Sequence, residues 1–149
     1  MKTKKLLIAS LFAAAMCFGT TAFADNKTAS ADKLPAEARS FVARNYPNRT
    51  IAYTSVDNEM FGTTYDVRLS DGTEIEFGKD GQWLEIKSSA ESAIPSAVVP
   101  DAIERYVRAN YPKTVIRNIE RDKRDCEVTL SNGVVLTFDK NYKLIGMDD

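Results

Sequence analysis

The sequence contains no histidine, and it has only two cysteines, one tryptophan and seven glycines. Without histidine, the usual general base and the commonest zinc ligand are missing, so Ser-His-Asp and Cys-His hydrolases are excluded. Glycine-rich phosphate loops and the Gly-x-Ser-x-Gly elbow are absent too. These absences predict a protein that is not an enzyme and that carries no cofactor and no metal.

Long apolar runs are confined to the start of the chain. Three lysines precede an apolar stretch at residues 6–18, and Ala22-Phe23-Ala24 follows with the small-x-small spacing of a signal-peptidase site. The stretch is shorter than the ~20 residues that a membrane-spanning helix needs. We therefore predict a signal peptide over residues 1–24, cleavage near Ala24, and a periplasmic or secreted protein without a membrane span in the mature chain.

Cys17 falls inside the predicted signal peptide, which leaves Cys126 as the single cysteine of the mature chain. A lipidated Cys17 is the alternative start, but the bulky Met16 before it disfavours that reading. Cys126 lies in a run that alternates apolar and polar residues, as a strand with one buried face does. It is predicted to be a buried thiol, with a reactive or dimer-forming thiol as the alternative.

The charge of the mature chain is mildly negative. Removal of residues 1–24 takes away three lysines and no acids, which leaves 17 − 21 = −4. Mixed signs with a small acidic excess argue against a nucleic-acid or anionic-membrane surface. The partner class that the charge leaves open is another protein or a small ligand.

An internal repeat spans nearly all of the mature chain. Residues 41–47 match residues 106–112 at an offset of 65, with an aromatic residue, Val, Asn, Tyr and Pro in register. Residues 65–72 then match residues 126–133 at an offset of 61. The change in offset places an insertion in the first unit, in the loop around residues 58–61.

Each unit has the pattern of one helix followed by a sheet. Apolar residues with helical spacing precede a Tyr-Pro pair, and proline forces the residue before it towards extended geometry, which ends the helix. Asp71-Gly72, Asp80-Gly81 and Asn132-Gly133 are hairpin signals between short alternating runs. The fold class predicted is α+β, with two tandem units that each pack one helix on a four-stranded antiparallel sheet. In the first unit the strands are expected near 50–56, 64–70, 73–78 and 82–87.

The domain organisation follows from the repeat and from composition. After the signal peptide we expect a flexible leader and two helix-plus-sheet units joined by a Ser- and Ala-rich linker. Their bounds are 25–33 for the leader, 34–88 for the first unit, 89–97 for the linker and 98–149 for the second unit.

The paired motifs resemble a known family. Helix-Asn-Tyr-Pro, followed by Val-x-Leu-x-Asp/Asn-Gly and Asp-Gly-x-Trp, is similar to the PepSY-like family of secreted bacterial proteins, which is described as like β-lactamase inhibitor protein in fold and is common in Bacteroidetes. The second unit departs from the pattern, because residues 141–144 read Asn-Tyr-Lys-Leu where residues 80–83 read Asp-Gly-Gln-Trp. The resemblance implies export, a helix against a four-stranded sheet in each unit, and no established catalytic residues.

The candidate binding surface lies in the first unit. If Trp83 follows the alternation of its strand, it faces solvent as an aromatic anchor among charged residues of the outer sheet face. The alternative is that Trp83 belongs to the core. The inserted loop is a second candidate, because it carries apolar residues where a plain turn is polar. The predicted partner-binding residues are Trp83, Phe61, Met60, Arg68, Glu74 and Glu76.

Three hypotheses for function are therefore carried forward. The first is an exported, non-enzymatic binding module that engages, and in one version inhibits, another protein through the outer sheet face and loops. The second is a periplasmic carrier or sensor of a small ligand or cation, although the turn aspartates lack the spacing of a calcium loop. The third is a hydrolase that uses Glu74 and Glu76, two residues apart on one strand, and solvated carboxylates on an open face are the simpler reading of this pair.

Overall fold

The computed structural model describes residues 31–60 and 62–149, so the predicted signal peptide and its cleavage site lie outside the described residues. A 3-10 turn opens the described chain, and one α-helix precedes each run of four strands. None of the described helices is long and apolar enough to cross a membrane. In chain order the elements are η1 (Ala31–Lys33), α1 (Ala36–Asn45), β1 (Ile51–Glu59), β2 (Gly62–Leu69), β3 (Glu74–Gly78), β4 (Trp83–Lys87), α2 (Asp101–Asn110), β5 (Ile116–Arg121), β6 (Asp125–Leu130), β7 (Val135–Asp139) and β8 (Leu144–Asp148).

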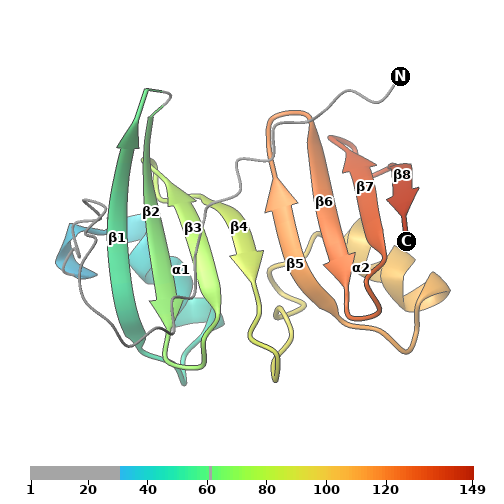
Figure 1. Cartoon of the computed structure of the whole chain (residues 1–149), viewed down its shortest axis with the longest axis horizontal. Coiled ribbons are helices and arrows are strands. Elements are labelled where there is room, and N and C mark those ends of the chain that lie inside the picture. The colour runs from blue at the N-terminus through green and yellow to red at the C-terminus, as the bar shows by residue number, and fades with distance from the viewer. Residues whose placement is uncertain (1–30, 61) are drawn as a thin grey trace, which may run out of the picture.

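The strands form one antiparallel sheet of eight strands in the order β1 to β8 (Figure 1). The α+β class is confirmed, but the prediction of one four-stranded sheet in each of two units is wrong, because all eight strands belong to a single sheet. The correction arises at β4 and β5, which pair through Glu85 with Glu120, Ile86 with Ile119 and Lys87 with Asn118. No tight turn joins these two strands, so no hairpin signal marks their pairing in the sequence.

Both helices lie on the same face of the sheet (Figure 1). Phe41 of α1 meets Phe77 edge-to-face at 5.7 Å between ring centroids, and Tyr106 of α2 meets Phe138 in the same way at 5.6 Å. Such edge-to-face pairs contribute beyond the area that they bury. We call this the helix face, and the opposite side of the sheet the outer face.

Each helix begins after a proline and ends at a Tyr-Pro pair, as the sequence predicts. Proline serves at the start of a helix because its missing N–H group has no partner there in any case. At the other end, Asn45 and Asn110 each donate a side-chain hydrogen bond of 2.9 Å to the carbonyl four residues earlier. These bonds tie each asparagine side chain back to the last turns of its own helix.

A β-bulge decides the orientation of Trp83. Phe77 pairs with Trp83 and Glu76 pairs with Glu85, so Leu84 is an extra residue on β4. The extra residue breaks the two-residue alternation and turns Trp83 to the helix face, opposite Phe77. Trp83 is 6% exposed and belongs to the core, so the exposed orientation of Trp83 is wrong and the core alternative holds.

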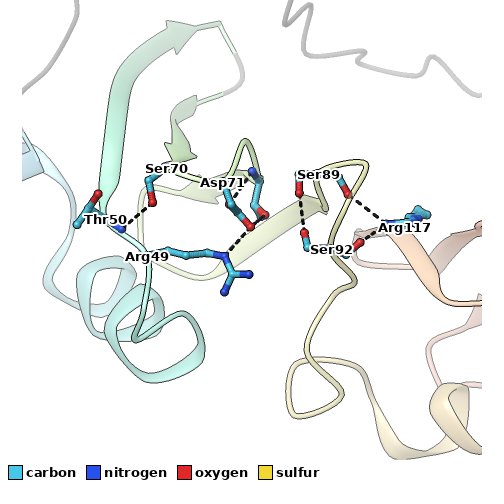
Figure 2. Close-up of polar contacts among 8 residues, drawn as sticks. Arg49, Thr50, Ser70, Asp71, Ser89, Ser92 and Arg117 are labelled. Atoms are coloured by element: carbon cyan, nitrogen blue, oxygen red, sulfur yellow. Dashed lines mark hydrogen bonds and ion pairs between the residues drawn. The ribbon is translucent and has the colours of Figure 1, made fainter.

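The segment between β4 and α2 is tied to the sheet by polar contacts (Figure 2). Arg117 of β5 donates through Nη1 to the carbonyls of Ser89 and Ser92, and Ser88 N–H donates to Arg117 O at 2.8 Å. On the neighbouring hairpin, Arg49 Nε donates to Asp71 Oδ2 at 2.5 Å. The contacts of Arg117 and Ser88 hold the segment expected to be a linker against β5, whereas the Arg49–Asp71 pair ties the loop after α1 to the β2–β3 turn.

Candidate functional site

Five carboxylates form a line across the outer face, one on each of five neighbouring strands. In register, Asp66 pairs with Glu76, Glu76 with Glu85, Glu85 with Glu120, and Glu120 with Glu127. Directly paired residues on neighbouring strands have Cβ atoms ~5 Å apart. We call these five residues the acidic row. Like charges placed directly opposite each other destabilise a sheet, so the row is a feature that packing alone does not favour.

Electrostatics within the acidic row shift several of its pKa values upward. Burial, together with the charges of Asp66, Glu85 and Glu120, raises the pKa of Glu76 to about 7. Burial followed by neighbouring carboxylates also raises the pKa of Glu120. The pKa of Asp66 is raised by burial, against a hydrogen bond from Ser55 that lowers it. The row therefore holds a concentrated negative potential that a cationic group would relieve.

Glu74 lies beside the acidic row but has a partner. Arg68 Nη2 donates to Glu74 Oε1 at 2.5 Å on the outer face, and both side chains are half-buried. The structure therefore brings together three of the predicted site residues, Arg68, Glu74 and Glu76. No described helix covers this face (Figure 1), and Glu74 is engaged by Arg68. The ion pair with Arg68 argues against Glu74 as one of two carboxylates free to act together, which the hydrolase hypothesis requires.

The inserted loop forms the tip of a long hairpin. β1 and β2 stay paired out to Glu59 and Gly62, beyond the ends of the other strands. Met60 at the tip is 94% exposed, the most exposed large apolar side chain of the described residues. Phe61 lies outside the described residues, so its predicted role in binding stays a prediction.

Aspartates in the turns are accounted for by the turns themselves. Asp71 accepts from Thr73 N–H and Oγ1, each at 3.0 Å, and Asp139 accepts from the N–H groups of Asn141 and Lys143. Within residues 31–60 and 62–149, no group of three or more Asp, Glu, Cys or His side chains is placed to hold a metal ion. Cys126 is a free, buried thiol, as predicted, and burial raises its pKa to about 12.

Two features of the structure are not indicated by any pattern in the sequence: the extension of the acidic row beyond β4, and the contact of Arg121 with Trp83. The continuation of the acidic row into Glu120 and Glu127 depends on the β4–β5 register, which no turn signal encodes. Arg121 is the other, since its guanidinium carbon lies 3.8 Å from the centroid of the Trp83 ring. β5 does not alternate, because its register shifts between Ile116 and Asn118, so its sequence does not indicate the face of Arg121. The bulge at Leu84 in turn places Trp83 where Arg121 contacts it.

The fold defines a class: an α+β protein whose two described helices both cover the same side of one antiparallel sheet. A family model described as "Putative beta-lactamase-inhibitor-like, PepSY-like" matches residues 63–146. The chain belongs to this PepSY-like family, as the resemblance in its motifs indicates. No curated protein matches the chain.

Solved structures of related proteins agree with this assignment. A protein from Bacteroides vulgatus, described as a "putative periplasmic protein" of the DUF2874 family, is 39% identical, with a TM-score of 0.80 over 86% of this chain and 100% of its own. A "putative calcium-regulated periplasmic protein" from Bacteroides thetaiotaomicron is 34% identical, with a TM-score of 0.80 over 84% and 98%. A second B. vulgatus protein of unknown function is 36% identical, with a TM-score of 0.76 over 80% and 95%. The protein is accordingly an exported one, periplasmic or secreted.

Proposed function

We propose that the protein is a non-enzymatic binding module that engages another protein through its outer sheet face and the β1–β2 hairpin tip. The acidic row carries this proposal. A row of five carboxylates in one register line fits a partner surface that presents lysine or arginine residues at matching spacing. Met60 adds an exposed apolar anchor at one end of that surface.

The experiment compares capture of partners by three forms of the mature protein. The first is wild type, and the second neutralises part of the row with Glu85→Gln, Glu120→Gln and Glu127→Gln. The third is a matched control that neutralises three acids elsewhere, Glu37→Gln, Glu91→Gln and Asp101→Asn. Immobilised forms are incubated with periplasmic extract at low and high salt, and the captured proteins are quantified by mass spectrometry.

The expected result is one or more basic proteins that bind wild type and the control but are reduced about tenfold on the row variant, with binding that weakens as salt rises. A purified partner then gives the affinity of each form and of Met60→Ala. If it is an enzyme, its activity with and without the protein tests inhibition. Identical partner lists and affinities for wild type and the row variant would overturn the proposal.

A second candidate function is supported by the same face. The relative from B. thetaiotaomicron is described as a "putative calcium-regulated periplasmic protein". The pKa of Glu76 is raised by burial first and then by the neighbouring carboxylates, whose negative charge a divalent cation would neutralise. Since no chelating group exists among the described residues, we propose a low-affinity association along the row rather than a closed coordination cage.

Thermal unfolding in calcium, magnesium and sodium chloride at equal ionic strength tests the cation proposal. A ligand at 100 times its dissociation constant adds ~2.7 kcal/mol of stability. The expected result is a calcium-dependent rise in the unfolding temperature that Glu76→Gln reduces. No difference between calcium and sodium contradicts the cation proposal and leaves the protein-partner proposal unaffected.

The division of the chain into two repeated units is kept as part of the proposal. Support comes from the bulges, which occur at Glu76/Phe77 in β3–β4 and at Thr137/Phe138 in β7–β8, 61 residues apart. The first unit then carries most of the contact surface, because it alone has the long hairpin.

A further inference from the structure

Arg121 lies at the point where the two halves of the sheet separate. The β4–β5 ladder stops at Glu85 and Glu120, and beyond it the two strands are linked by Arg121, whose Nε donates to Trp83 O at 2.8 Å. Its guanidinium lies over the Trp83 ring, with 3.8 Å between the guanidinium carbon and the ring centroid. Arg121 is half-buried on the helix face, so this place is separate from the acidic row.

The remaining donors of Arg121 have no acceptor. Among residues 31–60 and 62–149 its guanidinium makes the bond from Nε and the ring contact, and no ion pair. Asp80, whose charge acts on Arg121, forms no ion pair with it in the described part of the chain, and its Oδ1 accepts from Gln82 N–H at 3.1 Å within its own turn. Because Nε is bonded to Trp83 O, the donors that remain are those of Nη1 and Nη2. These two nitrogens can bind the two oxygens of one carboxylate.

A strained tyrosine lies in the turn between β7 and β8, at the same end of the sheet as Arg121. Tyr142 has φ 60°, the single positive value among the described residues other than glycine. The position 61 residues earlier is Gly81, where φ is 79° at no steric cost. A left-handed tyrosine costs roughly 1–2 kcal/mol, and such strain is concentrated at binding sites. Tyr142 is 43% exposed.

We propose that Arg121, stacked on Trp83 at the end of the sheet where the strained Tyr142 turn lies, is a binding site for a carboxylate group. Nη1 and Nη2 of Arg121 bind the two oxygens, and the indole ring fixes the plane of the guanidinium. The carboxylate comes either from a free small acid or from a side chain of a bound peptide. The site does not depend on the protein-binding role of the outer face.

Trp83 is the only tryptophan of the chain, so its fluorescence reports directly on this site. The mature protein is titrated with sodium acetate replacing sodium chloride at constant pH and ionic strength. A parallel arm uses a blocked peptide with one glutamate, and the same peptide with glutamine. Inorganic phosphate is the competing anion. We expect a saturable change with acetate or the glutamate peptide and none with the glutamine peptide.

Variants at Arg121 decide the result. Arg121→Gln should abolish the saturable change, and Arg121→Lys, which keeps the charge but not the fork, should weaken binding roughly tenfold. Arg124→Gln, an exposed arginine three residues on, should titrate as wild type. Thermal melts establish that each variant is folded, and if Arg121→Gln is not, the lysine variant decides. Equal affinity of wild type and Arg121→Lys, saturation by phosphate alone, or no saturation by either carboxylate would overturn the proposal.

Discussion

Arg121 and Trp83 join the two halves of the sheet beyond the last backbone pair. The guanidinium stacks on the indole ring at 3.8 Å, and Nε donates to the carbonyl of the same residue at 2.8 Å. One residue of β5 thus contacts both the side chain and the backbone of β4. The contact substitutes for ladder hydrogen bonds at a place where the strands diverge.

Replacing Arg121 by leucine should destabilise the protein. The change removes a cation–π contact and a hydrogen bond to a carbonyl, which together contribute about 1–2 kcal/mol. The matched control is Arg124→Leu, which removes an exposed arginine of the following turn and should change stability by less than about 0.5 kcal/mol. Urea unfolding followed by circular dichroism measures both. Equal losses for the two variants would contradict the role given to Arg121.

Replacing Gly81 by alanine should cost more than replacing Gly133 by alanine. Both glycines have positive φ, 79° and 90°, so both changes carry similar backbone strain. A Cβ atom at Gly81 would also lie 2.8 Å from Glu37 Cβ and 3.0 Å from Ala38 N, whereas at Gly133 it meets nothing within 4 Å. We expect roughly 1 kcal/mol of strain at Gly133 and at least 1 kcal/mol more at Gly81. Equal unfolding free energies for Gly81→Ala and Gly133→Ala would contradict this prediction. They would show that α1 moves away from the new Cβ atom at residue 81 without loss of stability.

Local structure was predictable from the sequence because its signals are local. The Tyr-Pro pairs end both helices, and the Asp-Gly and Asn-Gly pairs place the hairpins. The buried faces of β2, β3 and β6 follow from alternation, including Cys126. These features depend on residues within a few positions of one another.

The candidate site was only partly predictable, because its assembly depends on two events without a local signal. One is the pairing of β4 with β5, which extends the acidic row to Glu120 across a connection with no tight turn. The other is the bulge at Leu84, which reverses the face of Trp83. A single extra residue in a strand moves every following side chain to the other face, so alternation alone could not decide between the two orientations.

The stability of the protein should fall as the pH rises through neutrality, because of Glu76. Its pKa is about 7 in the folded protein and near 4.5 in the unfolded chain. Between these values the folded state holds a proton that the unfolded state has lost, so the free energy of unfolding decreases as pH increases. The loss of stability caused by Glu76 is complete above about pH 7 and absent below about pH 4.5.

Glu76→Gln should therefore be more stable than wild type at pH 8 and about equal at pH 4. Because Glu76 is partly exposed and solvent screens its neighbours, we expect a difference on the order of 1 kcal/mol at pH 8. Glu91→Gln, an exposed acid outside the acidic row, serves as the control and should follow wild type at both values. Guanidinium unfolding at pH 4, 6 and 8 measures the dependence. A constant difference between Glu76→Gln and wild type across this range would contradict the prediction.

Replacing Tyr46 by phenylalanine should stabilise the protein. Tyr46 is 3% exposed and its hydroxyl has no hydrogen-bond partner among the described residues, so folding removes that group from water without compensation from them. The tyrosine 65 residues later, Tyr111, instead donates to Met147 Sδ at 3.1 Å. Tyr46→Phe should raise the free energy of unfolding by about 1 kcal/mol, whereas Tyr111→Phe should leave it unchanged or lower it slightly. Thermal and urea unfolding of both variants measures this, and a loss of stability in Tyr46→Phe would indicate that an ordered water or a ligand satisfies the hydroxyl in solution.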